Sequence, residues 1–194
     1  LSLGGGRYKD ACDGEAVART VRLLTRAGIA VVSASGNESY ADSVAMPGCV
    51  SLAFTVAATD KRDGVSSFSN SDGVLDLWAP GTGIRAAVPG GGTQTKSGTS
   101  MAAPHVAGAF AALKARYPGA DLPGLEAVLR AHGPTIRDRR NGIERNRLDL
   151  GGAADAARAK WGDGTSRKPD AGEPKGGLLD IVPGLGGLLG GGRK

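Results

Sequence analysis

The chain has 194 residues, of which 40% are hydrophobic and 4% aromatic, and a formal net charge of +5. This length suits one domain with a tail, and the 33 glycines favour tight loops over a large aromatic core. The basic residues form no stripe interleaved with aromatics, and an acid interrupts their densest cluster, residues 137–140. Nucleic-acid binding is therefore not expected, that cluster is predicted to be solvated surface, and no apolar run is long enough to span a membrane.

The first forty residues predict alternating extended and helical segments. Residues 1–5 are expected to form a short strand that ends in glycines, and an amphipathic helix is expected from Glu15 to a stop at Gly28. Residues 29–34 are a continuous apolar run rich in β-branched side chains, which is typical of a strand covered on both faces. A helix followed by such a strand predicts a crossover in a parallel sheet, and so an α/β fold.

Ser35, Gly36 and Asn37 follow that strand directly. Open α/β sheets place their ligands at the carboxyl ends of strands, and an Asn amide there can donate a hydrogen bond to an oxyanion. Because Gly-Asn is also a common turn pair, a plain turn is the alternative.

Further elements follow along the chain. Residues 50–58 and 75–79 are expected to be extended, and Asp76, set between apolar residues, needs a polar partner. Residues 84–88 and 93–97 predict a hairpin around a Pro-Gly-Gly-Gly turn. A helix is predicted over residues 122–131.

Residues 98–108 read Gly-Thr-Ser-Met-Ala-Ala-Pro-His-Val-Ala-Gly and continue as an apolar stretch to residue 116. This predicts a buried helix with Ser100 in its first turn. Free backbone N–H groups and the positive end of the helix dipole would stabilise a developing oxyanion there. Ser100 is therefore a candidate nucleophile, and the alternative is that Thr99 or Ser100 only caps the helix.

Residues 98–108 resemble the nucleophile segment of the subtilisin-like serine proteases, peptidase family S8. Three other stretches match that family in the same order: Ser2-Leu3-Gly4-Gly5, Ser35-Gly36-Asn37 and Ala79-Pro80-Gly81-Thr82. The resemblance extends from Ser2 to about Ala157, and it implies a closing strand and helix over residues 148–158. It implies a three-layer α/β fold with a parallel sheet between helices, and a hydrolase that cleaves peptide bonds through an acyl-enzyme on Ser100.

The resemblance also implies roles for the other matched residues. Asn37 would share the oxyanion with the backbone N–H of Ser100. The substrate-binding residues would be Ser2, Leu3, Gly4, Ser35, Gly36 and Thr99.

A serine nucleophile needs a base, and the chain has two histidines. His105 lies five residues after Ser100 on the same helix, so it points away from the hydroxyl and is expected to be a packed structural histidine. Ser100, Asp121 and His132 run in the chain order of an α/β-hydrolase triad, which makes an esterase an alternative. Ala102 and Pro104 break the Gly-x-Ser-x-Gly elbow that such a triad requires.

In the subtilisin-like family the triad Asp and His precede the segment that matches Ser2 to Gly5. No match to either motif occurs in these 194 residues. The chain is therefore expected to be the C-terminal part of a peptidase domain whose N-terminal part is missing, and to be inactive alone. A binding module that holds peptides without cleaving them is the alternative.

Cys12 and Cys49 are either a disulfide or two buried thiols, since spacing alone does not decide between them. By resemblance to proteinase-K-like relatives, Asp76 with the carbonyl oxygens near Ser51 and Ala53 would bind a structural calcium ion, a hard cation that suits such oxygens. An ordinary hydrogen-bonded aspartate is the alternative. No cofactor is expected for the chemistry itself.

The resemblance further implies a secreted monomer that acts on protein or peptide substrates and carries a propeptide upstream. The peptidase part is expected to cover residues 1–160. Residues 161–194, rich in Gly and Pro with a short apolar tail, are expected to be a disordered linker and tail.

Overall fold

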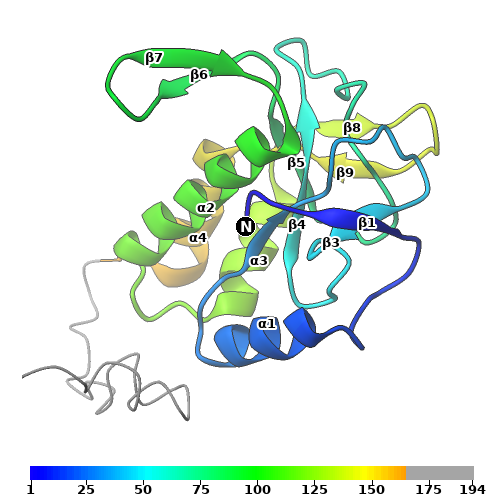
Figure 1. The fold of residues 1–194 in the computed structure, drawn as a ribbon. Coiled ribbons are helices and arrows are strands. Elements are labelled where there is room, and N and C mark those ends of the chain that lie inside the picture. Colours follow the sequence, from blue (N-terminus) through cyan, green and yellow to red (C-terminus); the bar gives the residue numbers. More distant parts are fainter. Residues whose placement is uncertain (165–194) are drawn as a thin grey trace, which may run out of the picture.

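The computed structural model describes residues 1–164 (Figure 1). The elements in chain order are β1 (Gly5–Tyr8), α1 (Ala16–Arg26), β2 (Val32–Ala34), β3 (Val44–Met46), β4 (Phe54–Thr59), β5 (Leu77–Pro80), β6 (Ile84–Ala87), β7 (Thr93–Lys96), α2 (Thr99–Arg116), α3 (Leu122–Ala131), β8 (Thr135–Arg137), β9 (Glu144–Asn146) and α4 (Leu150–Trp161). The helices and the hairpin β6–β7 lie where the sequence predicts them, within a few residues.

A parallel sheet in the order β2-β4-β5 forms the centre of the fold. Its register pairs Val32 with Phe54 and Val56 with Leu77. Every residue of β2 and β4 is buried, which explains why these strands come from apolar runs without alternation. The predicted α/β fold with a parallel sheet is confirmed.

Helix α2 packs across this sheet and buries one of its faces there (Figure 1). Val106 is fully buried, and the Phe110 ring meets the Phe54 ring edge-on with 5.1 Å between centroids. The other face of α2, which includes Ala107 and Ala111, is exposed. The predicted buried helix is thus only half buried, because within residues 1–164 the sheet covers it from one side.

The first strand lies later than predicted. Residues 1–5 are expected to be the strand, but β1 begins at Gly5 and runs antiparallel to β3. The start of the chain lies along the edge of β2 instead, where the Ala34 N–H donates to the Leu1 carbonyl over 3.0 Å. Gly6, at φ 74°, supplies a backbone turn within the glycine run that other residues rarely adopt.

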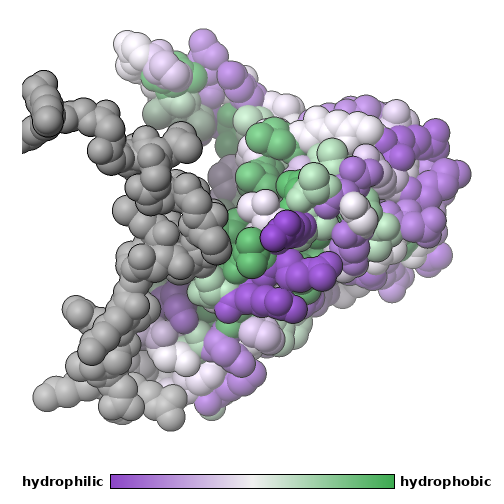
Figure 2. All heavy atoms as spheres, turned by 60° about the horizontal axis from the view of Figure 1, so that its bottom comes forward, coloured by the Kyte–Doolittle hydropathy of each residue, from purple (hydrophilic) through white to green (hydrophobic). Residues whose placement is uncertain are grey.

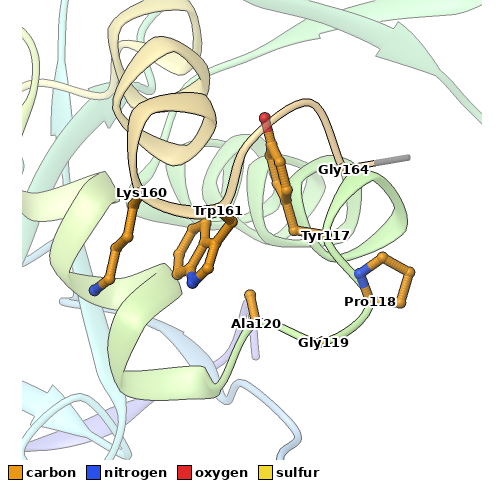
Figure 3. A pocket seen from close by; sticks show the side chains of 7 residues that line it. All are labelled: Tyr117, Pro118, Gly119, Ala120, Lys160, Trp161 and Gly164. Carbon is orange, nitrogen blue, oxygen red and sulfur yellow. The ribbon is translucent and has the colours of Figure 1, made fainter. Parts of the chain in front are cut away.

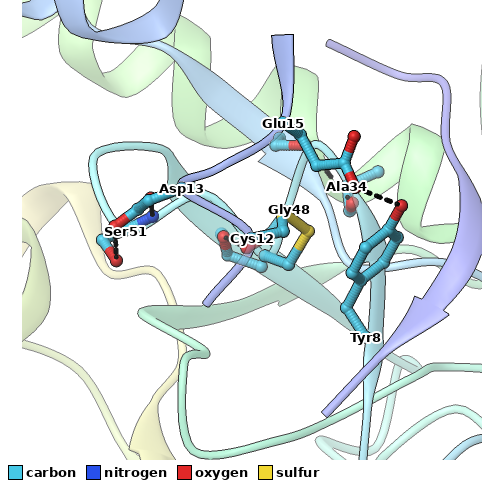
Figure 4. The surroundings of a disulfide bond; sticks show 10 residues. Tyr8, Cys12, Asp13, Glu15, Ala34, Gly48 and Ser51 are labelled. Carbon is cyan, nitrogen blue, oxygen red and sulfur yellow. Dashed lines mark hydrogen bonds between the residues drawn. A yellow bond between two sulfur atoms is a disulfide. The ribbon is translucent and has the colours of Figure 1, made fainter. Parts of the chain in front are cut away.

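Cys12 and Cys49 form a disulfide that ties the segment before α1 to the segment before β4 (Figure 4). Beside it, Asp13 accepts hydrogen bonds from the Ser51 backbone N–H and hydroxyl, at 2.9 and 2.8 Å. Both sulfur atoms lie in a small apolar cluster that includes Val21 and Val44. The sequence left the state of these cysteines open, and the structure joins them.

Apolar side chains are also exposed on one face of the molecule, where Figure 2 shows hydrophobic residues gathered among hydrophilic ones. A groove of about 400 Å³ lies between α1, β2 and α2, lined by apolar residues such as Leu24, Ile29 and Phe110. Among residues 1–164, no helix combines the length and the apolar character needed to cross a bilayer.

Helix α4 extends one residue past the expected domain boundary at 160. Trp161 packs against Tyr117 with 5.6 Å between ring centroids, and the two rings line a pocket of about 410 Å³ (Figure 3). This pocket lies at the C-terminal end of α2, about 25 Å along the helix from Ser100. The expected linker and tail lie, from residue 165 onward, outside the described residues.

Candidate functional site

Ser100 stands in the first turn of α2, where the helix begins after Gly98. Its backbone N–H is among the first amides of the helix, which have no acceptor within the helix. Its hydroxyl is partly exposed and donates to the Ser2 carbonyl over 3.2 Å. The Ser2 hydroxyl donates back to the Ser100 carbonyl over 3.0 Å. The structure thus places Ser2, a predicted substrate-binding residue, directly beside the predicted nucleophile.

Asn37 reaches the same helix start from the end of β2. Its side-chain oxygen accepts from the Thr99 backbone N–H at 2.8 Å and from the Thr99 hydroxyl at 3.1 Å. A backbone N–H can only donate, so the atom facing it must be the amide oxygen, and the NH₂ group is turned the other way. In the described residues that NH₂ group has no hydrogen-bond partner, and Asn37 is exposed. Within residues 1–164 the NH₂ group of Asn37 is therefore available as a donor near the start of α2.

Other residues predicted to bind substrate are buried supports. Thr99 and Ser35 are both fully buried. The Thr99 hydroxyl accepts from the Gly36 N–H over 3.2 Å, and the Ser35 hydroxyl donates to the Asn70 carbonyl over 2.8 Å. These side chains hold the Asn37 loop in place and present no hydroxyl to the surface, whereas Leu3 and Gly4 are exposed.

Asn70 supports the Asn37 loop and is not predicted from the sequence. Its side chain is fully buried, and its amide oxygen accepts from the backbone N–H groups of Glu38 and Tyr40 at 3.0 and 2.9 Å. Its NH₂ group donates to the Ser35 carbonyl and to the Glu38 carboxylate, at 3.2 and 2.6 Å. One side chain thus fixes both sides of Asn37. Only its place in a polar stretch, 33 residues after Asn37, marks it in the sequence.

The three arginines of the cluster at residues 137–140 are exposed, as the predicted solvated surface requires, but Asp138 is buried and supports this loop from behind. Asp138 is 1% exposed and binds Arg140 at 2.7 Å and the Ser71 hydroxyl at 2.5 Å. Arg140 also donates to the carbonyls of Ser39 and Ser69, at 3.2 and 2.7 Å. Burial would raise the pKa of Asp138, but the hydrogen bonds from Arg140 and Ser71 outweigh it and hold that pKa below its usual range.

The glycines of the matched motifs allow the segments to meet closely. The Gly98 N–H donates to the Gly81 carbonyl over 2.8 Å. A Cβ on Gly81 would lie 2.9 Å from the Gly98 carbonyl oxygen and 2.5 Å from the Ala58 Cβ. Only glycine fits at residue 81, so this motif sets the position of the helix start that carries Ser100.

Neither histidine lies at Ser100. The Nδ1 atom of His105 lies 2.8 Å from the Met101 carbonyl oxygen, within hydrogen-bond distance. The sequence predicts that His105 is packed, but it is exposed because it lies on the uncovered face of α2. Asp121 caps the start of α3 and His132 follows its end, so about 15 Å of helix separates them. The esterase triad of Ser100, Asp121 and His132 is therefore wrong.

A family model described as the subtilase family matches residues 1–140. The chain belongs to the subtilase family. Sequence relatives of this subtilase include the subtilisin-like serine protease Pen ch 13 of Penicillium rubens, 48% identical over 115 residues, which are 59% of this chain and 27% of that protein. Subtilisin-like protease 7 of Arthroderma gypseum is 43% identical over 113 residues, 58% of this chain and 27% of that protein.

Solved subtilases also match the fold. A cold-adapted subtilisin-like serine proteinase superposes with a TM-score of 0.66 and 34% identity, over 76% of this chain and 53% of that one. The patellamide maturation protease PatA gives a TM-score of 0.70 and 28% identity, over 82% of this chain and 62% of that one. The matched part of this subtilase chain corresponds to about a quarter of the length of the two sequence relatives named above.

Asp76, the predicted calcium ligand of the subtilase chain, lies between β4 and α3. Its carboxylate accepts from the Thr55 N–H at 2.6 Å and from the Arg130 Nε at 2.8 Å. Burial raises the pKa of Asp76, and Arg130 opposes that shift. Among residues 1–164, no group of three or more His, Cys, Asp or Glu side chains is placed to hold a metal ion.

Replacing Gly36 by alanine is expected to destabilise the subtilase chain by about 1–3 kcal/mol. Gly36 has φ 108°, and an added Cβ would lie 2.2 Å from the Asn70 amide nitrogen. Denaturant unfolding of the variant measures the loss. Gly14→Ala is the matched control, since its Cβ would meet nothing within 4 Å. Equal stability of the two variants would contradict this account of the loop.

Proposed function

We propose that the full-length protein carrying this chain is a secreted serine endopeptidase that cleaves peptide bonds through an acyl-enzyme on Ser100. The observation that supports the proposal is that Asn37 and Ser100 meet at one helix start, where the Asn37 side-chain oxygen accepts from the Thr99 N–H and the neighbouring Ser100 hydroxyl is accessible. The names of the two relatives reported above, both subtilisin-like proteases, support the substrate class.

In the proposed reaction the Ser100 Oγ attacks the scissile carbonyl carbon and gives its proton to a histidine base supplied by residues outside these 194. The carbonyl oxygen becomes an oxyanion, held by the Ser100 N–H and the Asn37 amide. The C–N bond then breaks, and the amine leaves with the proton from the histidine. Water hydrolyses the ester on Ser100 and restores the hydroxyl. No cofactor takes part.

Fluorophosphonate labelling of the full-length protein tests this proposal. The probe phosphonylates only a serine that has an activating base, so we expect one adduct, located on Ser100 by peptide mass spectrometry, together with hydrolysis of an unfolded protein substrate. Absence of the adduct, or an adduct on another residue, would refute the proposal.

The 194-residue chain by itself is proposed to be inactive. Its two histidines are held at Met101 and Val128, away from Ser100, so no base in the described residues activates the hydroxyl. The same probe should leave the isolated chain unlabelled. Labelling of Ser100 in the isolated chain would show that the base lies within it.

A further inference from the structure

The Asp76 site offers a donor set that does not fit the calcium ion implied by the subtilase resemblance. Calcium takes six to eight oxygen ligands, and a positively charged guanidinium beside those ligands repels it. Both Asp76 oxygens are already occupied, one by the Thr55 N–H and the other by the Arg130 Nε. A permanent positive charge therefore lies 2.8 Å from the carboxylate that would have to bind the metal.

Arg130 is held in this place from three sides. Besides Asp76, its Nη2 lies 3.2 Å from the Glu126 carboxylate, one helical turn earlier on α3. Its guanidinium carbon lies 4.8 Å from the centroid of the Phe54 ring. The two carboxylates are shielded, with side-chain exposures of 16% for Asp76 and 19% for Glu126. Arg130 is the cation between them.

The segment expected to supply carbonyl ligands faces the same arginine. Ser51 and Ala53 line a pocket of about 180 Å³ together with Glu126 and Arg130. The N–H and the hydroxyl of Ser51 both donate to the Asp13 carboxylate. The elements of the expected metal site are thus brought together, but around a side-chain cation.

We propose that the Arg130 guanidinium takes the place of calcium at Asp76, so that this part of the fold holds together without a metal ion. The guanidinium links Asp76, the residue before β5, to α3 and to the ring of Phe54 in β4. It performs the cross-linking that a bound ion would perform between the same segments. This assignment is independent of the proposed peptidase activity.

Thermal unfolding of the full-length protein, with EDTA and with millimolar CaCl₂, tests the proposal. Asp76→Asn removes the charge that a calcium ion would need at this site. If no calcium binds at Asp76, EDTA should change the Tm of this variant and of the wild type by the same amount. Calcium sites elsewhere in the protein would affect both equally. A wild-type Tm that falls more in EDTA than the Tm of Asp76→Asn would overturn the proposal.

Arg130 variants test whether the guanidinium itself stabilises this part of the fold. Arg130→Met keeps an apolar chain against Phe54 but leaves two shielded carboxylates without their cation, and should lower Tm in EDTA by about 3–8 °C. CaCl₂ should restore part of that loss. Arg130→Lys, which keeps the charge, should lie closer to the wild type and remain indifferent to calcium. The control is Arg139→Met, at an exposed arginine of the 137–140 cluster. An Arg130→Met Tm equal to that of the control would overturn the proposal.

Discussion

Replacing Ser100 by alanine in the full-length protein is expected to lower kcat for peptide hydrolysis by about a million-fold, the scale known for loss of a serine nucleophile of this type. Within residues 1–164 the Ser100 hydroxyl makes one hydrogen bond, to the Ser2 carbonyl at the surface, so its removal should leave the fold intact. Steady-state kinetics with a peptide substrate, together with the circular dichroism spectrum and Tm, measure both effects.

Ser97→Ala is the matched control for Ser100→Ala. Ser97 lies three residues earlier, is exposed, and accepts a hydrogen bond from the Gly83 N–H over 2.9 Å. It should retain nearly all activity. If Ser100→Ala kept kcat within about tenfold of the wild type, which is about 1.4 kcal/mol of barrier, the serine would not be the nucleophile.

The sequence predicts the centre of the fold because that centre is built from local patterns. The strands β2 and β4 are continuous apolar runs, and α2 and α3 begin and end within a residue or two of their signals. Three-residue strands such as β3 and β8 are not predicted. They pair with β1 and β9, from which 35 and 6 residues separate them in the chain. This pairing, more than their own composition, makes these short segments extended.

The residues of the site also divide into those that the sequence predicts and those that it does not. Ser100 and Asn37 can be found from sequence because each lies at a recognisable end of an element. Asn70 and Arg140 cannot, since each acts through contacts with a loop that lies 30 to 101 residues away in the chain. The need of Asp76 for a partner follows from its apolar neighbours, but nothing local indicates that the partner is Arg130, 54 residues later.

Asn37→Ala in the full-length protein is expected to lower kcat by about 100-fold to 1,000-fold with little change in KM, the range known for loss of one oxyanion donor. The expected asymmetry follows from the geometry. The amide NH₂ group has no partner within residues 1–164, so its hydrogen bond is gained only when charge develops on the substrate. Separate measurement of kcat and KM checks this expectation.

Alanine at residue 37 also removes the acceptor of the Thr99 N–H, so a second variant must separate positioning from catalysis. Asn37→Asp keeps an oxygen for the Thr99 N–H and hydroxyl, at 2.8 and 3.1 Å in the native chain, and so should keep Tm. It replaces the NH₂ donor by a negatively charged oxygen facing the developing oxyanion, so its kcat should fall at least as far as that of Asn37→Ala. An Asn37→Asp enzyme with near-native kcat would show that Asn37 serves only to hold Thr99, and that the oxyanion is stabilised elsewhere.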